Sequence, residues 1–442
     1  MREAGRIEAT STNLDIFSAP ADGSAQPTNL TADNDGTDNL PTLSPDGRSL
    51  AYFSMARATY EADRQVLQVR DLATGQVRAV TANWDRSVAS IAWAKDGRSI
   101  LVTAEDVMEA PVWRVDVASG EVTKLTGNGH AANVVPLPGG GAIFTQNSIM
   151  APDDIYSVDA RGKVSQLTNV NRDLLAELDP VSFEKFSFKG ANNDTVWGFK
   201  MKPREAAGKL PIAFVVHGGP QGSFGNGWSY RWNPRVFASP GYAVVSVDFH
   251  GSTGYGQAFT DSIQNNWGGW PLEDLQKGLA FATANDPQLD ADNACALGAS
   301  YGGYMMNWIA GQWPDRFKCL VQHDGVFDAR AMAYETEELW FDEWEHGQKA
   351  YFEDPAAFER WNPVNHVTKW KTPMLVITGE KDFRIPYTQG IASFTALQRR
   401  EIPSKLLVFP DENHWVLKPK NSIQWYGEVQ GWLGRWLGNQ GQ

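Results

Sequence analysis

Cysteine is scarce in this chain, and long apolar runs and an excess of positive charge are missing. The 442 residues include two cysteines, Cys295 and Cys319, and both lie inside apolar segments, so we expect buried free thiols. No stretch of about 18 apolar residues occurs, which argues against a membrane-spanning helix. Acidic residues outnumber basic ones by 52 to 39 without any basic stripe, which argues against nucleic acid and anionic membrane surfaces as partners.

Two further patterns are missing. No metal-ligand spacing and no glycine-rich phosphate loop occurs, so we expect no metal and no other cofactor. What the chain does have is size and apolar content. Its 442 residues favour at least two domains, and 42% hydrophobic residues suffice for full cores.

The segment GASYGG at residues 298–303 is the most informative part of the sequence. It follows the apolar run 294–297 and leads into a helical pattern, so we expect a strand, a sharp turn and a helix. A Gly-x-Ser-x-Gly turn of this kind presents its serine, here Ser300, as a nucleophile. An ordinary glycine-rich turn could carry the same letters, so the assignment depends on partners elsewhere in the chain.

Suitable partners follow in the order that an α/β-hydrolase requires, which is serine, acid, histidine. Asp382 follows the strand-like run 373–378, with Glu380 as the alternative acid, and His414 follows the strand-like run 406–408. Serine is a weak nucleophile until an imidazole takes its proton, and a carboxylate holds that imidazole in the required tautomer. We therefore predict Ser300, Asp382 and His414 as the catalytic residues.

The segment HGGP at residues 217–220 predicts an oxyanion hole. It ends the strand-like run 211–216, and in this fold such a loop offers one backbone N–H while the residue after the nucleophile offers another. The predicted donors are the backbone N–H groups of Gly219 and Tyr301. A simple tight turn is the alternative reading of Gly-Gly-Pro.

The first part of the chain repeats. Four strand-like segments are each closed by a threonine, and these threonines are spaced 50, 45 and 42 residues apart: Thr31, Thr81, Thr126 and Thr168. The pairs Asp46-Gly47 and Asp96-Gly97 between them indicate hairpins. A period of 40–50 residues with several short strands is typical of β-propeller blades. A β-sandwich or an irregular β domain is the alternative.

We predict that residues 1–180 form a partial β-propeller of about three to four blades whose N-terminal part is absent from this sequence. Propellers usually have four to eight blades. The open edges of an incomplete ring favour pairing with another chain, so self-association of this form is expected and a homo-oligomer stays open. Because the start is expected to be missing, both a periplasmic and a cytoplasmic location stay open.

From residue 181 the pattern changes to alternating strands and helices, which favours a mostly parallel sheet with helices on both faces. The clearest predicted helices cover residues 272–284, 301–312, 387–399 and 422–437. The predicted fold is therefore an α/β-hydrolase catalytic domain at residues 181–442, preceded by the partial propeller.

Taken together, the blades, the HGGP and GASYGG segments, Asp382 and His414 resemble the prolyl oligopeptidase family of serine peptidases. Segments 248–256, 334–341 and 410–419 are most similar to its dipeptidyl-peptidase 5 branch. The resemblance implies hydrolysis of short peptides through an acyl-enzyme, with release of N-terminal dipeptides. It also implies that Tyr334 lines the first specificity pocket and that Arg384 binds the carbonyl of the second substrate residue.

The sequence departs from the family in two places. Some relatives use a tyrosine side chain near the position of His217, so a backbone N–H near Gly219 is the expected donor here. The acidic residues that bind the substrate amine in well-known relatives lie in the propeller and find no counterpart. Three glutamates near Tyr334 could replace them or could belong to a solvated helix face: Glu335, Glu337 and Glu338.

Three functions compete at this stage. The first is a peptidase that releases N-terminal dipeptides, and the second is an acylaminoacyl-peptidase or small-ester hydrolase with the same triad. The third is a propeller-based binding protein with an inactive hydrolase domain, and the intact residues Ser300, Asp382 and His414 argue against it. Peptide substrates are the expected partners.

Overall fold

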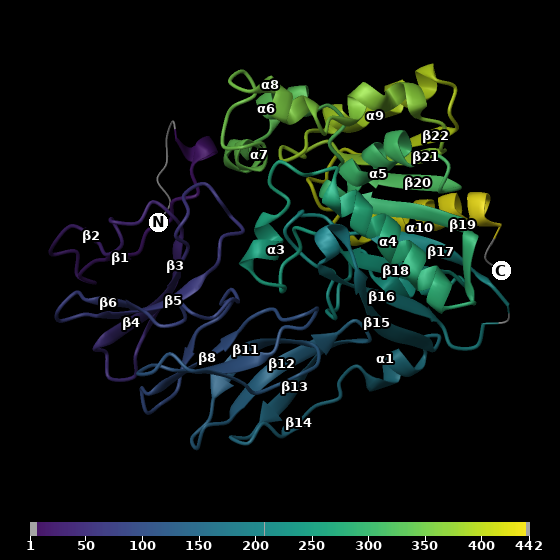
Figure 1. The fold of residues 1–442 in the computed structure, drawn as a ribbon. Helices are drawn as coiled ribbons and strands as arrows, with labels where there is room; N and C mark the ends of the chain where they lie inside the picture. Colours follow the sequence, from purple (N-terminus) through teal and green to yellow (C-terminus); the bar gives the residue numbers. More distant parts are fainter. Residues whose placement is uncertain (1–6, 207, 439–442) are drawn as a thin grey trace. The chain divides into compact units, whose positions relative to one another are not determined.

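The computed structural model describes residues 7–206 and 208–438 (Figure 1). Residues 1–6 of the predicted propeller part lie outside the described residues. The chain divides into two compact units. The first holds residues 1–177 with 225–228 and 253–258, and the second holds residues 178–224, 229–252 and 259–442.

The first unit is built from antiparallel sheets of consecutive strands, which are coloured purple to blue in Figure 1. Among the described residues, three of these sheets have four strands each, and a two-stranded sheet precedes them. The strands are β1 (Phe17–Ser18), β2 (Thr28–Asn29), β3 (Asp38–Leu43), β4 (Ser49–Ser54), β5 (Val66–Asp71), β6 (Val77–Ala79), β7 (Ala92–Trp93), β8 (Ser99–Thr103), β9 (Val112–Asp116), β10 (Val122–Lys124), β11 (His130–Pro136), β12 (Ala142–Ser148), β13 (Ala151–Val158) and β14 (Val164–Gln166). The short helix α1 (Arg172–Ala176) follows them.

The repeated threonines have one physical role in common. Each hydroxyl oxygen accepts a backbone N–H at the start of the strand-like segment that it closes, at 2.8–3.0 Å: Thr31 from Ile16, Thr81 from Leu67, Thr126 from Val112 and Thr168 from Ile155. The predicted Asp-Gly hairpins are also present, with both glycines in the left-handed region, at φ 70° for Gly47 and 67° for Gly97. The sequence period therefore reflects a repeated hydrogen bond.

The second unit contains one sheet of eight strands in the order β15-β16-β18-β17-β19-β20-β21-β22. The strands are β15 (Val181–Lys189), β16 (Thr195–Pro203), β17 (Leu210–Val216), β18 (Ala243–Asp248), β19 (Leu289–Ala299), β20 (Cys319–His323), β21 (Met374–Gly379) and β22 (Ser404–Phe409). The six strands from β18 to β22 in this order are mutually parallel. Strand β16 pairs antiparallel with both of its neighbours, β15 and β18. This is the sheet of an α/β-hydrolase, and its antiparallel beginning was not predicted.

Helices follow the strands in the same unit. They are α2 (Pro234–Ala238), α4 (Trp270–Asn285), α5 (Tyr301–Gln312), α6 (Ala329–Glu335), α7 (Leu339–Glu345), α8 (Pro355–Glu359), α9 (Tyr387–Arg399) and α10 (Pro419–Leu437), while α3 (Gln257–Asp261) lies where the chain passes between the units. The predicted bounds are confirmed at α5 and α9, and α4 and α10 begin two and three residues earlier than expected. Among the described residues, no helix has the length and apolar content needed to cross a membrane.

Alternate residues of the central strands face opposite sides of the sheet. Ile212, Phe214 and Val216 join the large core cluster that also contains Leu275 of α4 and Met305 of α5. The other face of β19 and β20 lies under α10, where the Trp432 indole donates a hydrogen bond to the carbonyl of Leu320 at 3.1 Å. Both faces are therefore covered, as an almost wholly parallel sheet requires.

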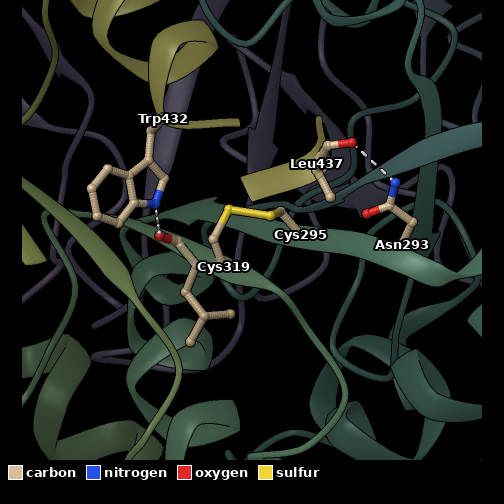
Figure 2. The surroundings of a disulfide bond; sticks show 6 residues. Asn293, Cys295, Cys319, Trp432 and Leu437 are labelled. Atoms are coloured by element: carbon tan, nitrogen blue, oxygen red, sulfur yellow. Dashed lines mark hydrogen bonds between the residues drawn. A yellow bond between two sulfur atoms is a disulfide. The ribbon is translucent and has the colours of Figure 1, made fainter. Parts of the chain in front are cut away.

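The two cysteines correct one prediction, because they form a disulfide rather than two free thiols (Figure 2). Cys295 of β19 and Cys319 of β20 stand directly opposite each other in the parallel register, with their Cα atoms 4.7 Å apart. Figure 2 shows Trp432 and Leu437 of α10 beside the bond. The sequence could not predict this pairing, because the register of two strands joined through a helix is not a local property.

Loss of the disulfide should destabilise the hydrolase unit. The bond closes a loop with a sequence separation of 24. In the chain-entropy description, such a loop stabilises the folded state by about 3 kcal/mol. We expect Cys295→Ala/Cys319→Ala to lower the free energy of unfolding by about this amount in urea titrations without reductant. Wild type treated with dithiothreitol should approach the variant, and equal midpoints for oxidised wild type and variant would contradict the crosslink.

Candidate active site

Ser300 occupies the turn between β19 and α5. Its backbone has φ 58° and ψ −122°, a conformation that a residue with a side chain rarely adopts. Its N–H donates to the carbonyl of His323 at 3.0 Å, which fixes the turn to the end of β20. A Cβ on Gly298 would lie 2.5 Å from the backbone carbonyl of Gly302, and a Cβ on Gly302 would lie 2.3 Å from the carbonyl oxygen of Val216, so both positions must be glycine for strand and helix to meet. The predicted elbow is present.

Asp382 lies in the loop after β21, and its carboxylate is buried at 1% exposure. Its Oδ1 accepts the backbone N–H groups of Arg384 at 2.9 Å and Ile385 at 3.0 Å, and these bonds fix its orientation. The alternative acid, Glu380, is exposed in the same loop. Asp382 is therefore held by the fold in one orientation.

His414 donates from its Nδ1 to Oδ2 of Asp382 at 2.7 Å. The bond places the proton of the neutral ring on Nδ1 and leaves Nε2 as an acceptor. The buried Glu412 holds the loop, because its carboxylate accepts the N–H groups of Leu417 at 3.2 Å and Lys418 at 3.0 Å. The structure thus brings the predicted acid and base into direct contact.

Asp324 is a further acidic residue close to Asp382 and His414, and the sequence analysis did not identify it. It directly follows β20, its N–H donates to Ile377 at 2.9 Å, and its Oδ2 lies 2.7 Å from Nε2 of His323. One ligand atom each of Asp324, Asp382 and His414 lies within 4.8 Å of the others, so this cluster has donors that could hold a divalent cation. The signal that identified Asp382, a carboxylate at the end of a buried strand, also applied to Asp324.

The charges around His414 determine its protonation. Burial opposes the charged ring, but the hydrogen bond and the negative charge of Asp382, with a further contribution from Asp324, raise the pKa of His414 above its ordinary value of 6.5. The guanidinium of Arg384 acts in the opposite direction. The ring therefore binds its proton more tightly than a free imidazole does.

The predicted oxyanion donors lie on either side of the elbow. A Cβ on Gly218 would lie 3.2 Å from the Cβ of Ser300, so the glycine loop passes close to the serine. Gly219 adopts φ 120°, which only glycine adopts readily. Tyr301 is the first residue of α5, and its buried hydroxyl donates to the carbonyl of Trp267 at 2.5 Å.

The side chain of His217 is engaged inside the protein. Its Nδ1 donates to the carbonyl of Gly218 at 2.7 Å, and its Nε2 accepts from the hydroxyl of Ser252 at 2.9 Å. Burial lowers the pKa of His217 to about 4, so the ring is neutral at pH 7. These bonds favour the backbone, rather than this side chain, as the donor near Gly219.

The side chains of the two predicted substrate residues, Tyr334 and Arg384, make further contacts of their own. The ring of Tyr334 is 64% exposed and packs edge-on against Tyr351. Arg384 forms an ion pair with Glu338 at 2.7 Å, and its guanidinium lies 5.5 Å from the ring centre of Trp415. The side chain of Glu338 is 13% exposed, so a solvated helix face does not describe it.

The sequence profile described as the prolyl oligopeptidase family matches residues 228–440, which include the elbow, Asp382 and His414. Over this range the chain is similar to the prolyl oligopeptidase family. Curated members of comparable sequence are named dipeptidyl-peptidase 5. The protein of Aspergillus fumigatus Af293 is 38% identical over 414 residues, or 91% of this chain and 57% of its own length. The protein of Schizosaccharomyces pombe is 38% identical over 409 residues, or 90% of this chain and 59% of its own length.

Solved structures share the fold at lower identity. An acylaminoacyl peptidase of Pyrococcus horikoshii has a TM-score of 0.84 and 22% identity, over 96% of this chain and 66% of that one. A puromycin-hydrolyzing peptidase of Mycobacterium tuberculosis has a TM-score of 0.73 and 22% identity, over 97% of this chain and 67% of that one. The chain spans less than two thirds of the curated relatives described above.

The charge of Asp324 should be measurable at His414. Replacing Asp324 with asparagine keeps the shape and removes a negative charge that raises the pKa of His414, so this pKa should fall. An NMR titration of the histidine ring protons, assigned with a His414→Gln variant, measures this. As a control, Asp411→Asn removes an exposed charge from the loop that carries His414, and it should leave the titration of His414 unchanged. An unchanged midpoint in the Asp324 variant would contradict the arrangement.

Proposed function

We propose that this chain is a serine peptidase that hydrolyses short peptides through an acyl-enzyme and releases dipeptides from free N-termini. The observation that carries the proposal is the 2.7 Å bond from His414 to the buried Asp382, at the sheet edge where Ser300 forms its strained elbow. The dipeptidyl-peptidase 5 proteins that resemble the chain over about nine tenths of its length support the substrate class.

The first half-reaction follows from the roles of these groups. Oγ of Ser300 attacks the peptide carbonyl carbon while Nε2 of His414 takes the hydroxyl proton. The resulting imidazolium is stabilised by Asp382, which stays ionised. His414 then gives the proton to the leaving amine nitrogen, the C–N bond breaks, and the N-terminal part of the peptide remains esterified to Ser300.

The second half-reaction reverses these roles with water. His414 takes a proton from a water molecule, whose oxygen attacks the ester carbon, and the returning proton restores the hydroxyl of Ser300. In both half-reactions the developing oxyanion would receive hydrogen bonds from the N–H groups of Gly219 and Tyr301. The neutral ring of His414 is the active form, so the rate should fall as the pH drops through its raised pKa.

For the substrate-binding residues we propose the roles that the family resemblance implies. Tyr334 would line the pocket for the residue before the cut, and Arg384 would donate to the carbonyl of the preceding residue. Glu338 supports this assignment, because its ion pair with Arg384 holds the guanidinium in one place.

For the first unit we propose the partial propeller at residues 1–180, followed by the catalytic domain at residues 181–442. Neighbouring four-stranded sheets are linked by side chains, since the Trp93 indole donates to the carbonyl of Thr42 at 3.1 Å and Arg114 donates to Gly140 at 2.6 Å. Such links between consecutive four-stranded units support blades.

The main test uses matched dipeptide chromogenic amides with a free or an acetylated amine. We expect the purified chain to prefer the free amine, and we expect Ser300→Ala to lower turnover by about 10⁴-fold or more without changing its melting temperature. A fluorophosphonate probe should label wild type and not the variant. Preference for the acetylated substrate would indicate an acylaminoacyl-peptidase, and a chain that is neither labelled nor active would be a binding protein.

Replacing Arg384 should slow hydrolysis only of substrates that have a second carbonyl for its guanidinium to bind. Arg384→Ala should lower kcat/KM on dipeptide amides about 10- to 100-fold, because a hydrogen bond to a charged group contributes about 1.5–3 kcal/mol. Acetate esters lack the second carbonyl and should be hydrolysed at nearly the wild-type rate. Arg360→Ala replaces an arginine whose guanidinium lies over Trp361, and it serves as the control. Equal losses on both substrate types would contradict the assignment.

A further inference from the structure

A buried carboxylate that the mechanism does not use lies at the end of α7. Glu345 is fully buried, at 0% exposure. Both of its oxygens are nevertheless occupied. Oε1 accepts from the side-chain amide of Gln221 at 2.7 Å, and Oε2 accepts from the indole N–H of Trp267 at 2.6 Å. A buried carboxylate without such donors would be costly, so these two bonds hold Glu345 where it is.

The first bond leads to the loop of Gly219. Gln221 stands two residues after Gly219 in the chain. A Cβ on Gly219 would lie 2.6 Å from the backbone N of Gln221, so the two residues are folded tightly onto each other. A side chain that fixes Gln221 therefore also fixes the peptide group at Gly219.

The second bond leads to Tyr301. The carbonyl of Trp267 accepts the hydroxyl proton of Tyr301 at 2.5 Å, and the two rings pack edge to face with their centres 5.3 Å apart. Tyr301 is the first residue of α5 and stands directly after Ser300. Holding its ring therefore fixes the first turn of the helix, including the backbone N–H of Tyr301.

From these contacts we infer that Glu345 is a positioning residue that ties the two halves of the oxyanion hole together. One carboxylate connects the loop of Gly219 to the helix start at Tyr301 and so fixes the spacing between the two donors. This inference rests on the proposed function, in which both N–H groups bind the oxyanion. A donor must lie close to the developing charge to act, and losing one costs on the order of 10²–10³ in turnover.

The connection does not require Glu345 to stay ionised. Burial raises the pKa of Glu345 to about 7, so both charge states occur near neutral pH. A protonated Glu345 can still accept from the indole N–H of Trp267. If the side-chain amide of Gln221 rotates, Glu345 can donate its own proton to the amide oxygen of that side chain. Glutamine at position 345 has the same pair of groups, one acceptor and one donor.

The test compares Glu345→Leu with Glu345→Gln. We expect the leucine variant to lose about 10- to 100-fold in kcat with KM within threefold, and the glutamine variant to recover most of that loss. Glu343→Leu makes the same change two residues earlier on α7, outside this network, and should be close to wild type. A merely structural role would not separate kcat from KM, nor would glutamine restore it.

Hydrogen exchange separates this inference from the proposed function. In Glu345→Leu, the amides of residues 217–222 and 299–303 should exchange faster than in wild type or Glu343→Leu, whether or not Ser300 reacts with a fluorophosphonate. If wild type is not labelled, the proposed function fails while faster exchange still supports the connection. If exchange and kcat are both unchanged, the inference is wrong.

A second variant covers the case in which Glu345→Leu does not fold. Gln221 is only half-buried, so Gln221→Leu removes the loop side of the connection and leaves the bond from Trp267 to Glu345 in place. It should lower kcat about tenfold and speed exchange in residues 217–222 alone. Wild-type values of both would overturn the role given to the Glu345–Gln221 bond.

Discussion

The parallel pairing of β19, β20, β21 and β22 is the constraint on which the site depends. Parallel strands all end at the same edge of a sheet, and the register aligns these ends closely, with Ala299 opposite His323, His323 opposite Ile377, and Gly379 opposite Phe409. Ser300, Asp324, Asp382 and His414 follow these ends by one to five residues. Asp324 and His414 are 90 positions apart in the chain, yet one ligand atom of each lies within 4.8 Å of the other because of backbone hydrogen bonds made elsewhere.

Buried carboxylates then provide the local order. Asp382 accepts two backbone N–H groups, and Glu412 accepts two more in the loop of His414. Asp274 of α4 behaves in the same way, because it accepts from the N–H of Ala191 at 2.7 Å and from the N–H of His250 at 2.8 Å. Each of these carboxylates accepts backbone N–H groups of the segments around it. The hydrogen bonds hold the loops of Asp382 and His414 in one conformation.

The sequence predicted the parts of this site that depend on local pattern and chain order. GASYGG identified the elbow, and polar residues after apolar runs identified Asp382 and His414, because a strand end can be recognised from its own residues. Contacts that depend on register or on distant packing could not be predicted. The Cys295–Cys319 disulfide required knowledge of how two strands align, and the bonds of Glu345 to Gln221 and Trp267 join residues 124 and 78 positions apart.

The disulfide also affects how the protein withstands attack by peptidases. Cys295 and Cys319 lie on either side of the segment that carries Ser300 and the whole of α5. A single backbone cut between them would not separate the chain into two pieces, because the sulfur bridge would still join both fragments. Ser300 would stay anchored at β19 on one side and β20 on the other. A nicked molecule could therefore keep its elbow in place and would run as one species until a reductant released the fragments.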